Sequence, residues 1–166
     1  HRRRHSFPTR RSSDLIPEEC IANLVVEKRR GQLYLSLKGN VQCQQTMTVR
    51  VVMPMLHRLE AFDATHVQAA ITSHHSLQVT TYGASTVVLY GEGVMTQFMA
   101  HDASTLDASG FSSQLSTCEA RGAATLKTHA TQSIDAKAQD ASSIVVKGSP
   151  PAKTLKKGVA ASIKER

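Results

Sequence analysis

Aromatic side chains are scarce in this sequence, and tryptophan is absent. Phe and Tyr make up 4% of the 166 residues, while apolar residues as a whole make up 40%. A layered core filled by large aromatic rings is therefore not expected. The length suffices for one domain with a real core. The abundance of Ala, Ser and Thr favours a narrow interior or closely stacked layers.

Cysteines are few, and they form no recognisable pattern. Cys20, Cys43 and Cys118 are an odd number, and no C-x-x-C spacing occurs. Neither a zinc site nor a complete disulfide framework is therefore indicated. Cys118 falls where the repeats described below otherwise carry apolar residues, so we predict a small, buried side chain there. No apolar run approaches the length of a transmembrane segment.

Catalytic motifs are missing as well. The sequence contains no G-x-S-x-G, no P-loop and no H-E-x-x-H. His74 and His75 are adjacent, and neighbours on a strand point to opposite faces, so a shared metal is not expected. Asp102, Asp107 and Glu119 are a candidate cluster for a polysaccharide-degrading β-helix, but nothing in the sequence distinguishes them from turn and surface residues. We expect no enzyme activity, no metal and no cofactor.

Charge is concentrated at the two ends of the chain. The net charge is +7, of which residues 1–15 contribute +4 and Lys147–Arg166 contribute +5, leaving −2 for residues 16–146. Nucleic-acid binding is not expected, because no aromatic residues are interleaved with the basic ones. The string from His5 to Leu15 resembles the translation of a sequencing-library adapter. We predict that residues 1–15 are an artefactual or disordered segment outside the fold, with a natural basic arm as the alternative.

Residues 16–54 read as N-terminal strands. Leu24–Val26 is followed by a turn at Arg29-Arg30-Gly31, and then leucines alternate with other residues, which predicts a strand with one buried face. A further alternation ends at Pro54, which indicates an edge position or a strand end. The alternating positions are Leu33, Leu35 and Leu37, then Met47, Val49, Val51 and Met53.

Residues 55–166 are dominated by a short repeat of the form Asp/Gly-Ala-Ser/Thr-x-aliphatic. Its Ala recurs at positions 64, 84, 103, 123, 141 and 160, at spacings of 20, 19, 20, 18 and 19 residues. A period of this length predicts a solenoid, here a single β-solenoid domain over residues 16–166 whose repeat turns occupy 55–166. An antiparallel sandwich is the competing architecture, but it does not require equal strand spacing.

Each position of the repeat predicts a column along the solenoid. The aliphatic column is expected to form an inward ladder, and the Ala column is expected to lie where the interior narrows. Asp and Gly tolerate left-handed conformations, so the first column is expected to form the turns; a calcium site is the alternative for its acids. The ladder is Val67, Val87, Leu106, Leu126, Ile144 and Ile163; the turn column is Asp63, Gly83, Asp102, Gly122 and Asp140.

A hydroxyl-rich column precedes the inward ladder and is expected to point outward. It consists of His66, Thr86, Thr105, Thr125, Ser143 and Ser162. Such a column on a flat face is a candidate ligand face for glycans or ordered water, and the candidate residues are Thr86, Thr105, Thr125 and Ser143. The alternative is that Thr and Ser simply suit exposed strands.

Three stretches resemble the bacterial putative auto-transporter adhesin family with a head GIN domain. They are Leu33–Leu37, Val51–Ala61 with the Gly/Asp-Ala-Ser units that follow, and Val145–Lys157 with Ser162–Lys164. The resemblance spans residues 16–166 and lacks the first strands of the family pattern. It implies an all-β, right-handed parallel β-helix, a β-solenoid with turns of about 18–20 residues, in an exported protein of the periplasm, outer membrane surface or extracellular space.

The family resemblance offers no catalytic residue. We therefore expect a non-enzymatic surface module, an adhesin or a ligand-presenting domain, whose partners are surface glycans or other cell-surface macromolecules. The alternative is a polysaccharide-binding or polysaccharide-degrading β-helix protein. The signal region is expected to lie upstream of Ile16.

Overall fold

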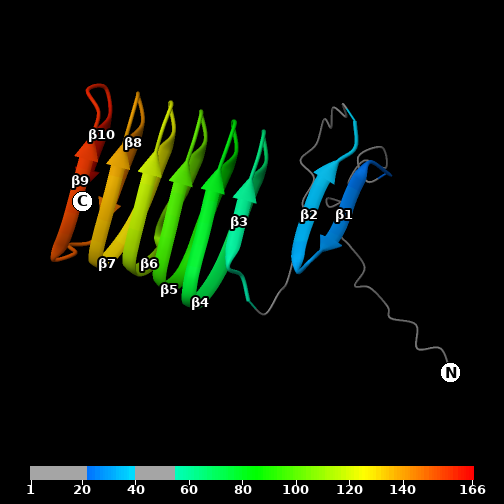
Figure 1. Ribbon diagram of the computed structural model, residues 1–166, viewed down its shortest axis with the longest axis horizontal. Coiled ribbons are helices and arrows are strands. Elements are labelled where there is room, and N and C mark those ends of the chain that lie inside the picture. Colours follow the sequence, from blue (N-terminus) through cyan, green and yellow to red (C-terminus); the bar gives the residue numbers. More distant parts are fainter. Residues whose placement is uncertain (1–21, 40–54) are drawn as a thin grey trace, which may run out of the picture. The chain divides into compact units, whose positions relative to one another are not determined.

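The computed structural model describes residues 22–39 and 55–166, and the chain divides into two compact units, residues 1–52 and 53–166. The predicted segment 1–15, Cys20, Cys43 and the alternating stretch Met47–Met53 lie outside the described residues. Ten strands are described, and Figure 1 shows them. Residues 55–166 contain strands, turns and bends and no helix.

The first unit contains an antiparallel hairpin of β1 (Leu24–Arg29) and β2 (Gln32–Leu37). Arg30 and Gly31 connect the strands with φ values of 50° and 78°, the left-handed pair that a two-residue hairpin turn requires. The predicted strands and turn are therefore present. The predicted buried face is wrong, because Leu33, Leu35 and Leu37 are 39–42% exposed in the structure. The hairpin pairs its two strands in a single layer.

The second unit is a parallel β-solenoid, as predicted (Figure 1). Four long strands, each bent within its length, form its middle: β4 (His66–Thr81), β5 (Thr86–Ala100), β6 (Thr105–Ala120) and β7 (Thr125–Ala138). Short strands complete the outer turns: β3 (Arg58–Ala61), β8 (Ser143–Lys147), β9 (Ala152–Lys157) and β10 (Ser162–Glu165). Neighbouring strands pair in parallel, so equivalent residues of successive turns lie side by side.

Each turn of the solenoid contributes to two faces. The first face is formed by the initial parts of β4–β7 together with β8 and β10, because β8 pairs with Thr125–His129 and β10 pairs with β8. The second face is formed by the later parts of β4–β7 together with β3 and β9, because β9 pairs with Ser133–Ala138. Bends with register shifts join the first face to the second, and sharp corners join the second face to the next turn.

The predicted aliphatic ladder is confirmed. Val67, Val87, Leu106, Leu126, Ile144 and Ile163 are consecutive register partners. The four middle members are completely buried, and they pack into one core with side chains of the second face. The period of 18–20 residues is therefore the length of one turn, after which the chain reaches the equivalent position of the next turn. Burying one such side chain stabilises the fold by about 1.5–3 kcal/mol.

The predicted turn column is confirmed as well. Asp63, Gly83, Asp102, Gly122 and Asp140 all have left-handed φ values, between 58° and 70°. Two of the carboxylates make a further contact with the preceding turn. The N–H of Gly83 donates to Asp102 Oδ2 at 3.0 Å, and the N–H of Gly122 donates to Asp140 Oδ2 at 3.0 Å. The acids therefore stabilise the corners of neighbouring turns.

The Ala column of the repeat does not lie inside the solenoid. All six alanines are exposed at the outside of the corners, so the prediction of a narrowed interior there is wrong. The following residue is the one that points inward, and Ser85, Ser104 and Ser142 are buried. Each donates to two carbonyl oxygens: Ser142 Oγ reaches Gln139 O at 2.6 Å and Ala120 O at 2.9 Å.

Small side chains narrow the interior at the end of the second face instead. Ala100, Ala120 and Ala138 are register partners there and are completely buried. A buried network of hydroxyls lies at the start of the same face, where Thr96 Oγ1 lies 2.8 Å from Ser113 Oγ and 3.1 Å from Ser116 Oγ. No buried side-chain polar atom in the described residues lacks a hydrogen-bond partner.

Candidate ligand-binding face

The hydroxyl column occupies one outward line of the first face, directly after the corners. Thr86, Thr105, Thr125 and Ser143 are consecutive register partners, with His66 before them and Ser162 after them. The side chains are half-buried, except for that of His66, which is exposed. The turns of a parallel sheet are about 4.8 Å apart, so the column offers a hydroxyl at each step of that length. Ser162 donates to Ser143 Oγ at 3.1 Å, which links the last two rungs.

A second outward line runs beside the hydroxyl column, two residues further along each strand. Its members in chain order are Gln68, Val88, Asp107, Lys127, Val145 and Lys164. Residues two positions apart on a strand point to the same side. The neighbours are therefore uncharged over the first two turns and acidic beside Thr105, whereas Thr125 and Ser162 have lysine neighbours and Ser143 has Val145.

A stack of planar side chains lies at the end of the second face, just before the corners. The ring centroids of Phe62 and Tyr82 are 5.0 Å apart with planes at 4°, and those of Tyr82 and His101 are 5.1 Å apart with planes at 10°. Because each ring covers the face of its neighbour, the middle of the stack offers ring edges rather than a flat platform for a sugar. The stack contributes to the stability of the fold through the attraction between stacked rings, about 0.5–1.5 kcal/mol for an aromatic pair.

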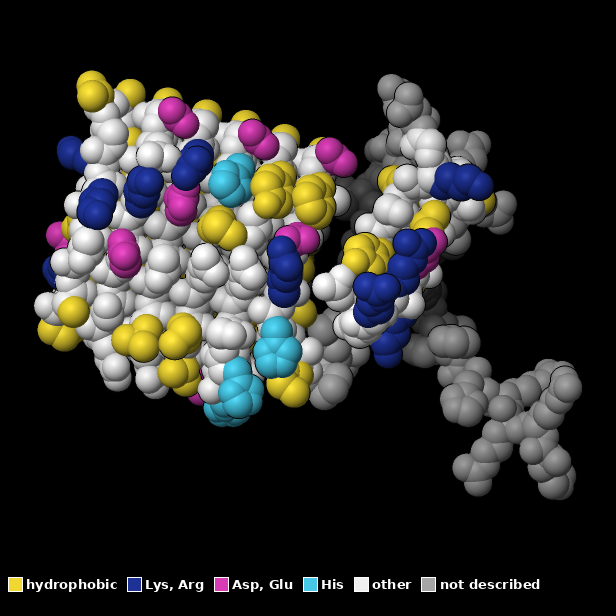
Figure 2. Space-filling model, in the orientation of Figure 1, with side chains coloured by type: hydrophobic (Ala, Val, Ile, Leu, Met, Phe, Trp, Pro, Cys, Tyr) yellow, Lys and Arg dark blue, Asp and Glu magenta, His cyan; other side chains and the backbone are white. Residues whose placement is uncertain are grey.

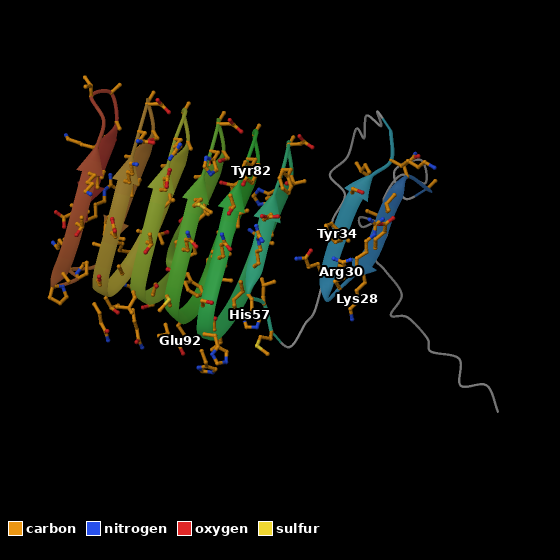
Figure 3. The ribbon with its side chains drawn as sticks, in the orientation of Figure 1. Lys28, Arg30, Tyr34, His57, Tyr82 and Glu92 are labelled. Atoms are coloured by element: carbon orange, nitrogen blue, oxygen red, sulfur yellow. The ribbon has the colours of Figure 1, made fainter. Side chains whose placement is uncertain are left out.

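The sequence contains a signal for this stack that was missed. Phe62, Tyr82, His101, Arg121 and Gln139 each stand one residue before the turn column, so they repeat with the same period as the alanines. Figure 3 shows Tyr82 near the corners and Glu92 at the opposite edge of the solenoid, where the bends lie.

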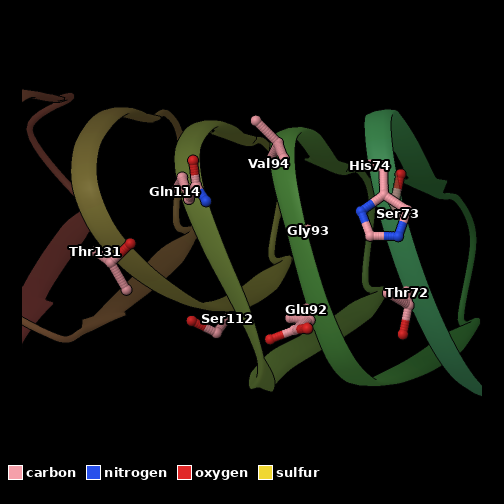
Figure 4. Close-up of a pocket in the computed structure, with 9 residues that line it drawn as sticks. All are labelled: Thr72, Ser73, His74, Glu92, Gly93, Val94, Ser112, Gln114 and Thr131. Atoms are coloured by element: carbon pink, nitrogen blue, oxygen red, sulfur yellow. The ribbon is translucent and has the colours of Figure 1, made fainter.

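A shallow groove of about 270 Å³ crosses the bends of the middle turns (Figure 4). Gly93 forms part of it, and the side chain of Phe111 packs beneath, since a Cβ at Gly93 would lie 2.8 Å from that ring. Polar side chains dominate the lining, among them Glu92 and His74. The groove is distinct from the predicted hydroxyl column and shares none of its residues.

The three acids considered for catalysis lie on three different parts of the solenoid. Asp102 is at a corner, where it accepts from Gly83. Asp107 is on the first face, and its Oδ1 accepts from the Ser109 hydroxyl at 2.6 Å. Glu119 is on the second face, where it forms an ion pair with Arg121. Each carboxylate therefore has a local partner of its own, and the three do not face a common space.

The adjacent histidines depart from the expected alternation. His74 and His75 are both exposed, because they lie at the register shift between Ser73 and Ser76. The ring of His75 lies 6.2 Å from that of His57. No group of three or more His, Cys, Asp or Glu side chains suited to a metal occurs within residues 22–39 and 55–166.

Cys118 is buried, as predicted, and its thiol is free. Desolvation raises the pKa of its thiol to about 11, against a small opposing effect of hydrogen bonds with Ser116 and Thr128. The thiol is therefore neutral at physiological pH and is unsuited to nucleophilic chemistry. Its position in the ladder of the second face, between Phe98 and Ala136, makes it a core residue.

Within the described part of the chain, no helix has the length and apolar character needed to cross a membrane.

Comparison with known proteins identifies one family: residues 16–150 match the family described as putative auto-transporter adhesin, head GIN domain. No curated protein matches the sequence. Among solved structures, a putative adhesin from Bacteroides fragilis NCTC 9343 is similar, with a TM-score of 0.72 and 21% identity over 90% of this chain and 79% of that one. At this identity the likeness concerns the fold.

Proposed function

Given that the chain belongs to the putative auto-transporter adhesin family with a head GIN domain, we propose that it is a non-enzymatic, exported module that binds glycans or other macromolecules at a cell surface. The supporting observation is the in-register hydroxyl column of Thr86, Thr105, Thr125 and Ser143 on the first face. A linear glycan offers hydroxyls at regular intervals, and a column of regularly spaced hydroxyls matches such a ligand over several turns.

The expected mechanism is extended contact with many weak hydrogen bonds. A neutral hydrogen bond contributes about 0.5–1.5 kcal/mol net, so useful affinity requires several rungs. Thr and Ser suit this purpose because each hydroxyl both donates and accepts. The backbone needs no rearrangement to present the column, since the parallel pairing already fixes its geometry.

The hydroxyl column is tested by adding negative charge and bulk to it. The full chain with Thr86→Glu, Thr105→Glu and Thr125→Glu is expected to lose at least tenfold in affinity for the glycans that the wild-type chain binds on a glycan array. The matched control carries Gln78→Glu, Gln97→Glu and Thr117→Glu on the second face, where these residues are neighbouring register partners. Equal losses in both variants, at similar melting temperatures, would contradict the assignment of the first face.

We also propose that the chain has no catalytic activity. The separate positions of Asp102, Asp107 and Glu119 support this proposal, because a glycosidase needs a pair of carboxyl groups that flank the bond to be cleaved. Incubation with neutral and acidic polysaccharides is expected to release no new reducing ends. Turnover that is lost in Asp107→Asn would favour a polysaccharide-degrading enzyme instead.

Export is tested separately from binding. Antibodies against the solenoid are expected to label intact cells that produce the natural protein, and added protease is expected to remove the labelled protein. Labelling only after lysis would exclude display on the cell surface and remove adhesion from consideration.

A further inference from the structure

The two halves of the solenoid carry opposite charge. Residues 55–120 contain one basic and six acidic residues, a net charge of −5, whereas residues 121–166 contain nine basic and three acidic residues, a net charge of +6. Figure 2 shows Lys and Arg side chains gathered over the C-terminal turns on the surface that it displays. The positive charge is therefore not confined to the terminal tail, because Lys127 and Lys137 belong to β7.

On the first face, the last three turns combine the hydroxyl column with lysines. We call this the lysine–hydroxyl surface, and it consists of Thr125 and Lys127 on β7, Ser143 and Lys147 on β8, and Ser162 and Lys164 on β10. The three lysines are exposed, and the hydroxyl residues are half-buried. Lys127 and Lys164 are two rungs apart in one line, a separation of roughly 10 Å.

Acidic side chains compensate the lysines of this surface only in part. Within the described residues, none of the three takes part in an ion pair. The nearest acid in the register is Asp107, beside Lys127, and its Oδ1 accepts from the backbone and hydroxyl of Ser109. Glu165 is the other acid on these rungs, and it pairs with Lys153 at 2.5 Å.

Protection of the sheet edge does not explain two of the three lysines, Lys127 and Lys147. Charged residues guard strands that have a free edge. Lys127 lies on β7, which is paired with β6 on one side and with β8 on the other. Lys147 lies on β8, which is paired with both β7 and β10. Lys164 lies on the edge strand β10, but the other two lysines lie on strands without a free edge and are available for recognition of an anionic partner.

We propose that the lysine–hydroxyl surface binds an acidic polysaccharide, with the hydroxyls contacting sugar hydroxyls and the lysines contacting carboxylate or sulfate groups. This inference rests on the proposed function and names its ligand class. Lysine ammonium groups form charge-assisted hydrogen bonds with such anions. A linear acidic glycan is favoured over a nucleic acid because β7, β8 and β10 contain no Phe, Tyr or Trp side chain on which a base could stack. It is favoured over a lipid surface because hydroxyl columns match a chain of sugar units.

The test uses the full chain and polygalacturonate as the probe, with dextran as a neutral polysaccharide and phosphatidylglycerol vesicles as an anionic surface without sugar repeats. The variant Lys127→Gln, Lys147→Gln and Lys164→Gln is expected to bind polygalacturonate at least tenfold more weakly in calorimetry at low salt. The matched control Lys137→Gln, Lys156→Gln and Lys157→Gln removes three charges elsewhere and is expected to change binding less than threefold. Raising the salt concentration should weaken wild-type binding, because screening reduces these contacts.

The outcomes separate this inference from the function on which it rests. Equal weakening by both triple variants means unspecific attraction to a basic protein and overturns the lysine–hydroxyl surface. Binding of dextran as tight as that of polygalacturonate overturns the acidic class while the glycan-binding function stands. Tighter binding to the vesicles at matched charge overturns the polysaccharide in favour of a membrane. Binding to no glycan in any form overturns both proposals.

Discussion

The middle turns and the final turn of the solenoid share one register but differ in what they place at the inward positions. In β5–β7, these positions hold Val, Leu, Phe, Ala and hydroxyl residues that are buried. In β9, the same columns hold Lys153, Leu155 and Lys157, and all three are exposed. Lys153 pairs with Glu165, which occupies an inward column of the first face in β10.

The corners differ in the same way. Five corners use a left-handed Asp or Gly, whereas Val159 at the sixth is not left-handed, as expected for a β-branched residue. The contrast shows that the repeat length is enough to set the backbone path and the register of a turn. The side chains at the inward positions determine whether a turn can be covered by another one, and charged residues there disfavour further stacking.

The largest effect on stability is expected from shortening a side chain in the middle of the inward ladder. Leu106→Ala should lower the free energy of unfolding by about 3–5 kcal/mol, because the side chain is completely buried and leaves a cavity. Leu155→Ala in the final turn should cost less than about 1 kcal/mol, since that side chain is 39% exposed. Urea unfolding of both variants measures the difference, and equal losses would remove the distinction between the turns.

The next effect concerns the buried thiol of a middle turn. The pKa of Cys118 is raised to about 11 from 9.0, so the folded chain holds this proton while the unfolded chain releases it. The stabilisation is therefore present below about pH 9 and is lost as the pH rises towards 11, on the order of 2–3 kcal/mol in total. In urea unfolding at pH 8, 9.5 and 11, the wild-type chain should lose more unfolding free energy with rising pH than Cys118→Ala does. Parallel pH profiles for the two chains would contradict a buried, protonated thiol.

A smaller effect is expected at the corners. Gly122→Ala should destabilise the fold by about 1–3 kcal/mol, because φ is +70° and the new Cβ would lie 2.9 Å from Asp102 O. Val159→Ala at the final corner should change stability by less than about 0.5 kcal/mol, since the side chain is fully exposed. Thermal unfolding of the two variants checks the contrast between corners.

The smallest effect on stability is expected at the Lys153–Glu165 pair, which is partly exposed and contributes at most about 1 kcal/mol. Association should change instead. Replacing both residues, as Lys153→Ile with Glu165→Val, continues the apolar columns of Ile134 and Val146 into the final turn. We expect this double variant to associate in a concentration-dependent way in analytical ultracentrifugation. Lys156→Ile, on the outward side of β9, is the control and should associate less. A double variant that stays as monodisperse as the wild type would show that charge at these positions does not limit stacking.

The sequence predicted the ladder and the turn column because both depend on properties of a single residue type. A row of aliphatic residues at one period has to be buried, and Asp or Gly at a corner tolerates left-handed φ. The Ala column was misplaced because a small side chain is compatible with either side of a corner. After the left-handed residue, the chain direction puts Ala103 outside and Ser104 inside, and only the backbone path decides this.

The polar interior and the surface were harder to predict for related reasons. Thr96 and Ser116 are buried because they satisfy each other's hydrogen bonds, a condition that no periodicity reveals. The candidate hydroxyl column was located correctly in register, because it is offset by one residue from the inward ladder. The alignment of Lys127 with Lys164 depends on the parallel pairing of turns that are almost twenty residues apart in the sequence.

The corner contacts between Asp and Gly define the unit in which such a protein can be copied. Asp102 caps the N–H of Gly83, and Asp140 caps that of Gly122, so each contact joins two successive turns of unlike type. A duplication of one glycine turn, or a deletion of the aspartate turn that follows it, would place like beside like and leave a glycine N–H without its carboxylate. Duplicating two turns keeps every such contact. Genetic lengthening of this solenoid should therefore proceed by pairs of turns, with 38 or 39 residues gained at a time, as the distances from Ala64 to Ala103 and from Ala103 to Ala141 indicate.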